Sequence, residues 1–237
     1  MASPTVGILA GMGPFSTAPF VDMVVSECQR QYGARHDVDF PRLMICSQPA
    51  PFYEDRPVDH AALEEAIQDG LRRLEGAGAA FLAIACNTAH IYYPALAARA
   101  KVPLLDMVEL AVAALPAETR RVAVVAARPT AEAGIYQRRL AARGFTVVEG
   151  RWQGDVDKLL SATRSAREPV LFTTFWTGLI DQARAAGADT LLVACLDLSG
   201  VLCHAVTTLR VVDAAQALAE EIVAQWLVRR PAAGSAR

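Results

Sequence analysis

Apolar runs alternate along the chain with segments in which apolar residues recur every three or four positions. The short apolar runs predict strands, and they occupy 5–10, 43–47, 81–85, 102–106, 121–126, 145–148, 190–194 and 209–213. The helical spacing, closed in places by glycine, predicts helices over 17–30, 60–76, 91–100, 130–143, 174–186 and 214–227. Strands that alternate with helices in this way favour an α/β fold built on parallel sheets.

The second half of this pattern repeats the first. An apolar strand leads into Cys86 in one half and into Cys195 in the other, and a later strand ends at Asp106 and at Asp213 with similar spacing. Landmarks that recur in the same order indicate an internal repeat. We therefore expect two pseudo-symmetric domains, each a mostly parallel sheet flanked by helices, with the first formed by 1–106 and 214–237 and the second by 107–213.

Size and charge narrow the classes of partner. The 237 residues are 53 % hydrophobic, which is compatible with two modest cores. With 23 basic and 25 acidic residues, the formal charge of −2 leaves no excess of cations for nucleic acid or an anionic membrane. No apolar run reaches the roughly 20 residues of a membrane helix, and the first residues do not resemble a secretory signal. We expect a cytoplasmic protein that acts on a small molecule.

The five cysteines, at 28, 46, 86, 195 and 203, form an odd set without a CxxC pair or a histidine at metal-ligand spacing. This pattern argues against a disulfide framework, structural zinc or any other metal site. Cys28 and Cys46 are interpreted as small buried hydrophobes. Cys203 adjoins His204, but the side chains of adjacent residues diverge, so a catalytic pair is not expected there.

Small and polar residues collect where the predicted strands end, which is where parallel sheets bind ligands. These segments are 11–17, 49–59, 86–88, 127–130 and Cys195. The turn Gly11-Met12-Gly13 is similar to the start of a dinucleotide-binding loop, but Ser16 stands at the third glycine position. A tight turn or a small-molecule contact is favoured over a nucleotide site.

Several motifs spread over nearly the whole chain carry a family resemblance: Gly7-Ile8-Leu9-Ala10-Gly11-Met12-Gly13-Pro14 with Thr17, Asp55-Arg56, Cys86-Asn87-Thr88-Ala89-His90, Val102-Pro103-Leu104-Leu105-Asp106, and Cys195 with Asp213. They resemble the aspartate/glutamate racemase family, and most closely its aspartate racemase branch. The resemblance implies a racemase that works without pyridoxal phosphate, metal or other cofactor. It also implies two pseudo-symmetric α/β domains with the active site in the interdomain cleft, and a homodimer.

Racemisation requires a base on one face of the α-carbon and an acid on the other. On the resemblance, Cys86 and Cys195 are the paired acid and base. A free thiol has a pKa near ~8.5, and helix N-termini and backbone donors can hold one of the two as thiolate. Which of the two serves the L enantiomer is left open.

The resemblance also supplies candidate substrate contacts. Asn87 and Thr88 are expected to bind the α-carboxylate, although both residue types also cap helices. Arg56 is expected to clamp a distal carboxylate, with a solvated loop arginine as the equal alternative. His90 is interpreted as a packing or cap-supporting histidine and not as a catalytic base. The remaining expected contacts are Met12, Gly13, Thr17 and Asp197.

The second cysteine motif departs from the family. Leu196 and Asp197 stand where the family usually carries Thr and Glu, and the stretch from Gln153 to Val156 lacks a basic residue that the aspartate branch tends to have. Fewer groups remain to pair with a second carboxylate, and an unpaired buried charge is costly. The expected substrate is therefore aspartate, glutamate or a related, less acidic amino acid.

Two other classes of function stay open. One is a decarboxylase or cis–trans isomerase of a dicarboxylate, because arylmalonate decarboxylases, maleate isomerases and hydantoin racemases look like distant relatives and fold alone does not separate their reactions. The other is a ligand-binding relative that has lost turnover.

Overall fold

The computed structural model describes residues 3–53, 56–165, 169–200 and 207–230. Its contacts group the chain into two compact units, each with a parallel sheet. Unit 1 comprises the described parts of 1–85, 92–106 and 218–237, and unit 2 those of 86–91 and 107–217. The short segment 86–91 thus packs with unit 2, whereas the sequence pattern assigns it to the first domain.

Unit 1 is built on three parallel strands. β1 (Thr5–Ala10) lies between β2 (Arg42–Ser47) and β3 (Phe81–Ile84), and every residue of β1 and β3 is buried. Strands covered on both faces read as continuous apolar runs, which is why the sequence indicates them clearly. β2 is the partly exposed edge.

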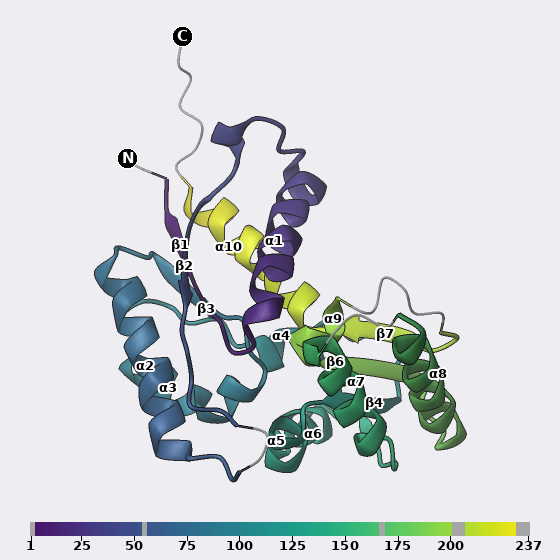
Figure 1. Ribbon diagram of the computed structural model, residues 1–237. Coiled ribbons are helices and arrows are strands. Elements are labelled where there is room, and N and C mark those ends of the chain that lie inside the picture. The colour runs from purple at the N-terminus through teal and green to yellow at the C-terminus, as the bar shows by residue number, and fades with distance from the viewer. Residues whose placement is uncertain (1–2, 54–55, 166–168, 201–206, 231–237) are drawn as a thin grey trace. The chain divides into compact units, whose positions relative to one another are not determined.

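Helices lie on both sides of this sheet (Figure 1). α1 (Thr17–Tyr32) lies along α10 (Ala214–Arg229), and the rings of Tyr32 and Trp226 are 5.7 Å apart. α2 (His60–Gly76) and α3 (Tyr93–Arg99) lie on the other side, joined by an ion pair between Arg99 and Glu64. Three 3-10 turns complete the helical segments up to α3, at Pro14–Ser16, Asp37–Asp39 and Thr88–Tyr92.

Unit 2 is built on four parallel strands in the order β5-β4-β6-β7. They are β4 (Arg121–Ala126), β5 (Thr146–Val148), β6 (Thr190–Ala194) and β7 (Arg210–Asp213). Its helices are α4 (Met107–Ala113), α5 (Arg128–Ala133), α6 (Ile135–Ala142), α7 (Gln153–Ser165), α8 (Pro169–Ala185) and α9 (Leu196–Ser199).

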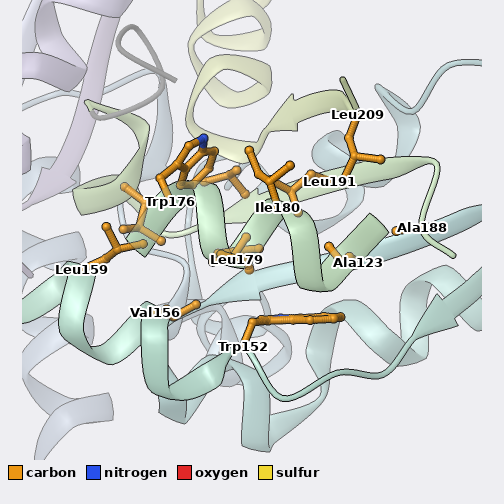
Figure 2. Close-up of a cluster of buried hydrophobic side chains, with 14 of the residues drawn as sticks. Ala123, Trp152, Val156, Leu159, Trp176, Leu179, Ile180, Ala188, Leu191 and Leu209 are labelled. Carbon is orange, nitrogen blue, oxygen red and sulfur yellow. The ribbon is translucent and has the colours of Figure 1, made fainter. Parts of the chain in front are cut away.

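The core of unit 2 forms where α7 and α8 pack on the sheet, and Figure 2 shows their side chains gathered there. Trp176 and Leu179 of α8 and Val156 of α7 are almost fully buried. Trp152, just before α7, donates its indole N–H to the carbonyl of Val124 in β4 at 3.1 Å. Because this packing fixes β4 and β6, it also fixes the turns that follow them.

The two sheets share one topology, as the internal repeat predicts. In each, the first strand in sequence pairs with both the second and the third. The third strand then pairs with a fourth segment, which is β7 in unit 2 and a single parallel bridge from Leu82 to Leu104 in unit 1. The alternating pattern thus predicts the α/β class and both parallel sheets correctly.

Four expected elements differ in detail. The helix expected over 174–186 is α8, which begins earlier, at Pro169. The helix expected over 130–143 is divided into α5 and α6, because Gly134 has a φ of 63° that breaks the helical path. The strand expected over 102–106 is reduced to the bridge at Leu104. The helix expected over 91–100 begins earlier, as the 3-10 turn Thr88–Tyr92 that leads into α3.

Candidate active site

The two repeated cysteines occupy equivalent positions in the fold. Cys86 follows Ala85 at the carboxyl end of β3, and Cys195 directly follows β6. Cys86 is buried and Cys195 is partly buried. Since 86–91 packs with unit 2, both thiols belong to the same compact unit.

Each thiol faces an equivalent pair of backbone donors. The N–H groups of Thr88 and Ala89 hydrogen-bond the Cys86 thiol, and those of Asp197 and Leu198 hydrogen-bond the Cys195 thiol. In both cases the donors belong to the residues two and three positions after the cysteine, at the start of a short helical turn. Such donors stabilise a thiolate relative to a thiol.

Burial opposes this effect. Loss of solvent raises the pKa of Cys86 to about 11 and that of Cys195 to about 12. The carboxylate of Asp197 also raises the pKa of both thiols, and Cys86 raises that of Cys195. Cys86, Cys195 and Asp197 are therefore close enough to act on one another, and a second negative charge is disfavoured once one of them is ionised.

Asn87 presents an amide beside Cys86. Its side chain is buried, and Oδ1 accepts a hydrogen bond from the hydroxyl of Tyr136 in α6. That bond fixes which way the amide points. Nδ2 is buried and has no hydrogen-bond partner among the described residues, so it can donate to an acceptor that a bound molecule supplies.

Thr88 and His90 tie the same turn to unit 2. The hydroxyl of Thr88 shares a 2.8 Å hydrogen bond with that of Thr130, a buried residue of α5. Nε2 of His90 accepts the N–H of Met107 at 3.2 Å, so its other nitrogen, Nδ1, carries the proton and donates it to the carbonyl of Cys86 at 2.8 Å. A neutral histidine that bridges two backbone groups supports the turn and is not placed as a catalytic base.

The glycine turn after β1 belongs to unit 1. Gly11 has a φ of 91°, and a Cβ there would lie 2.7 Å from the backbone nitrogen of Gln48, so only glycine fits. Its N–H donates to the hydroxyl of Thr17 at 3.2 Å, while Met12 and Gly13 are partly exposed. The turn lies at the same edge of the sheet as the end of β3, because β1 and β3 are parallel neighbours.

Arg56 lies in the loop before α2 and is exposed. Its guanidinium stacks over the ring of Tyr53 at 4.2 Å. The structure thus brings five expected site residues together in unit 2, namely Cys86, Asn87, Thr88, Cys195 and Asp197. The other four, Met12, Gly13, Thr17 and Arg56, belong to unit 1.

Sequence reasoning missed the contacts that support this site. Tyr136 lies one helical turn from Leu140 on a buried face, so its pattern is that of a core residue. Thr130 lies in the 127–130 turn that the sequence does indicate, but its partner Thr88 is remote in sequence. Among the described residues, no group of three or more His, Cys, Asp or Glu side chains is placed to hold a metal ion.

The family model described as Asp/Glu/Hydantoin racemase matches residues 9–222. The chain belongs to this racemase family. The broad specificity amino-acid racemase RacX of Bacillus subtilis (strain 168) is 39 % identical over 223 residues, which cover 94 % of this chain and 98 % of that relative.

Solved racemase structures share the fold. Picrophilus torridus aspartate racemase superposes with a TM-score of 0.80 at 24 % identity, over 96 % of this chain and 95 % of that chain. Glutamate racemase from Aquifex pyrophilus gives a TM-score of 0.64 at 19 % identity, over 92 % and 82 %.

The family and the B. subtilis relative make the chain an amino-acid racemase, which is an isomerase, and racemisation without pyridoxal phosphate fits this family. No helix in the described ranges is long and apolar enough to span a membrane.

Proposed function

We propose that this racemase inverts the α-carbon of an amino acid by proton transfer to and from the thiols of Cys86 and Cys195. The observation that carries the proposal is the matched environment of the two sulfurs within one unit. Each has backbone donors two and three positions after the cysteine, and each lies within the electrostatic range of Asp197. A two-base inversion needs such equivalent groups, because each must serve as acid in one direction and as base in the other.

The reaction then has two proton transfers. The thiolate of one cysteine takes the α-proton and becomes a thiol, while the electron pair of the C–H bond stays on the α-carbon and delocalises into the carboxylate. The thiol of the other cysteine gives its proton to the opposite face and becomes the thiolate. The product is the mirror-image amino acid, and the two sulfurs have exchanged protonation states.

Electrostatic repulsion between negative charges supports a pair in which one cysteine is ionised and the other is protonated. Because Cys86 and Asp197 both raise the pKa of Cys195, ionising both thiols at once is unfavourable, and the pair retains one proton over a wide pH range. The α-ammonium group of a bound substrate would favour the single thiolate, since an opposite charge lowers the pKa of a thiol.

Asn87 and Thr88 are proposed to bind the α-carboxylate. Nδ2 of Asn87 is a buried donor without a partner in the described ranges, and its orientation is set by Tyr136. A donor placed next to the base also stabilises the charge that reaches the carboxylate as the α-proton leaves. Met12, Gly13, Thr17, Arg56 and Asp197 remain proposed substrate contacts.

The proposed substrates extend beyond the acidic amino acids. Leu196, which replaces a family threonine, is buried and adds an apolar side chain next to Cys195. The relative with 39 % identity is named a broad specificity amino-acid racemase, which supports the same interpretation. Aspartate and glutamate remain in the proposed range, together with less acidic amino acids.

The test is to incubate the protein in deuterated water with the L and D forms of aspartate, glutamate, alanine, leucine and lysine. Chiral chromatography with mass spectrometry then scores inversion and deuterium at the α-carbon. Cys86→Ala and Cys195→Ala should each lose racemisation by roughly a hundred- to ten-thousandfold. Cys46→Ala, which removes a thiol outside the site, is the matched control and should stay active.

Full racemisation by Cys195→Ala would refute the two-thiol scheme. Parallel assays with malonates, maleate and hydantoins address the other reactions. Turnover of one of these without α-inversion of any amino acid would replace the proposal. A rise in melting temperature with an amino acid, but no exchange, would instead indicate binding without catalysis.

A further inference from the structure

The residue four positions after each cysteine is a buried polar side chain with a bridging role. It is His90 after Cys86 and Ser199 after Cys195, and the two are 2 % and 6 % exposed. They occupy the same place in the internal repeat although they differ chemically. Buried polar side chains are normally retained only where their hydrogen bonds are satisfied, so the bonds that these two residues make are informative.

His90 connects the Cys86 turn to α4. Its ring donates to the Cys86 carbonyl and accepts from the N–H of Met107, the first residue of α4. Both bonds end on backbone atoms. The ring therefore holds the thiol-bearing turn at a fixed distance from the helix that follows the fourth segment of the sheet.

Ser199 connects the Cys195 turn to β7 and α10. Its hydroxyl donates to Oδ1 of Asp213 at 2.8 Å, and the N–H of Ala215, in the first turn of α10, donates to the same oxygen at 2.9 Å. Asp213 is itself fixed, because it ends β7 and pairs with Val193 of β6. Ser199 also approaches the Cys195 carbonyl, with Oγ at 3.4 Å and its N–H at 3.3 Å.

Both turns need such support. The donors that face the sulfurs come from a five-residue 3-10 turn and from the four-residue α9. Turns this short do not hold their geometry by themselves. Each one is instead anchored by the residue four positions after its cysteine to the first turn of the helix that follows the fourth segment of its sheet. The anchor is a neutral imidazole after Cys86 and a hydroxyl–carboxylate pair after Cys195.

We infer that His90 positions the Cys86 thiol, and that Ser199 together with Asp213 positions the Cys195 thiol, as two separate anchors for the two proton transfers. The inference rests on the proposed function. Neither anchor touches the reacting atoms, and each acts through the turn that carries its cysteine. Each anchor therefore affects a different proton transfer, because each transfer has its own transition state with a different sulfur at the α-carbon.

Primary deuterium isotope effects can tell the two transition states apart. In Ser199→Ala the transfer between Cys195 and the α-carbon slows. The isotope effect on kcat/KM then grows for the α-deuterated enantiomer that gives its proton to Cys195. For the other enantiomer, the isotope effect on kcat/KM falls toward the equilibrium isotope effect. Its deuteron leaves to Cys86 in the first step, and the slow proton transfer from Cys195 comes afterwards. His90→Ala must produce the opposite asymmetry.

The experiment measures both α-deuterated enantiomers of the fastest amino acid in the panel described above. The variants Ser199→Ala and His90→Ala should lose roughly ten- to a hundredfold in kcat, the scale expected for a misplaced catalytic group. Asp213→Asn and His90→Asn are the second variants if either alanine variant fails to fold. The first should reproduce the asymmetry of Ser199→Ala, and the second that of His90→Ala.

Asp189→Asn is the matched control. Asp189 likewise accepts backbone N–H bonds, from Arg120 and Arg121, but it lies before the amino end of β6, away from the thiols. The Asp189→Asn variant should retain the isotope effects of the protein without substitutions. Unchanged isotope effects in the anchor variants, or shifts in the same direction for both anchors, would overturn the inference. Racemisation that survives loss of either thiol would instead refute the proposed function, so the two failures are distinguishable.

Discussion

At the scale of single residues, the thiols of Cys86 and Cys195 are mostly protonated at neutral pH, because burial raises the pKa of Cys86 to about 11 and that of Cys195 to about 12. The backbone donors limit this rise without cancelling it. In the proposed mechanism the active species has one thiolate and one thiol, and it is therefore a minor form of the substrate-free protein. Its population, and with it the rate at low substrate concentration, depends on pH.

The pH dependence follows with a definite sign. The pH range from 6.5 to 8.5 lies below the raised pKa of both thiols. Each pH unit in this range should therefore increase the thiolate fraction, and thus kcat/KM, by about tenfold. Initial rates at low substrate concentration in a constant-ionic-strength buffer series test this. Cys46→Ala should follow the same line. A flat profile over this range would mean that the thiolate is already formed at pH 6.5.

The hydroxyl of Tyr136 offers a second test at this scale. Tyr136→Phe leaves the buried Oδ1 of Asn87 without its donor and frees the amide to turn, so we expect a loss of about 1–3 kcal/mol in the free energy of unfolding and a higher KM. Tyr93→Phe is the control, since it removes a hydroxyl bonded to the carbonyl of Leu104 in unit 1. An unchanged KM in Tyr136→Phe would argue against Asn87 as a carboxylate ligand.

At the scale of elements, the sequence predicts best what is buried on both faces. β1, β3, β4 and β6 are almost entirely apolar after their first residue, and both cysteines follow such strands. α4 escapes prediction because its short, almost wholly apolar sequence carries no helical period. The bonds of Asn87 to Tyr136 and of Ser199 to Asp213 join residues remote in sequence, and no local pattern specifies them.

The break between α5 and α6 shows why a lone glycine is hard to interpret. An isolated glycine is tolerated inside helices, and only the backbone conformation reveals that Gly134 ends one helix and begins another. Gly134→Ala places a side chain at positive φ and should destabilise the protein by roughly 1–2 kcal/mol.

Gly178→Ala is the matched control for this substitution. Gly178 lies within α8, and a Cβ there meets open space, so the change should stabilise the protein by roughly 0.5–1 kcal/mol. Denaturant titrations of the two variants should therefore shift in opposite directions. Equal shifts would show that backbone conformation does not control the break between α5 and α6.

At the scale of the whole molecule, the chain leaves unit 1 and returns to it twice. Residues 92–106 return to it from the cysteine turn, and the described part of the chain from Leu218 onward returns as α10. Gln31 of α1 donates to the carbonyl of Glu220 at 2.9 Å, and Trp226 is buried against Tyr32. We therefore expect the stability of unit 1 to depend on the last helix in the sequence.

Trp226→Ala should cost about 3–5 kcal/mol, as large core truncations do. Hydrogen exchange should show faster exchange in β1 and β3, while the amides of β4 and β6 keep their protection. Trp226→Phe, which keeps an aromatic ring against Tyr32, should cost much less. Equal loss of protection in both sheets would show that the two units unfold together.

The shared topology of the two sheets has an evolutionary consequence. A single ancestral repeat would carry one sulfur, able to take a hydrogen from a stereocentre and return it, or one from water, to the same side. Such a protein would catalyse isotope exchange with retention of handedness. If the proposed two-thiol mechanism holds, a duplication that added a second sulfur in an equivalent setting would turn such an exchange catalyst into one that interconverts mirror images.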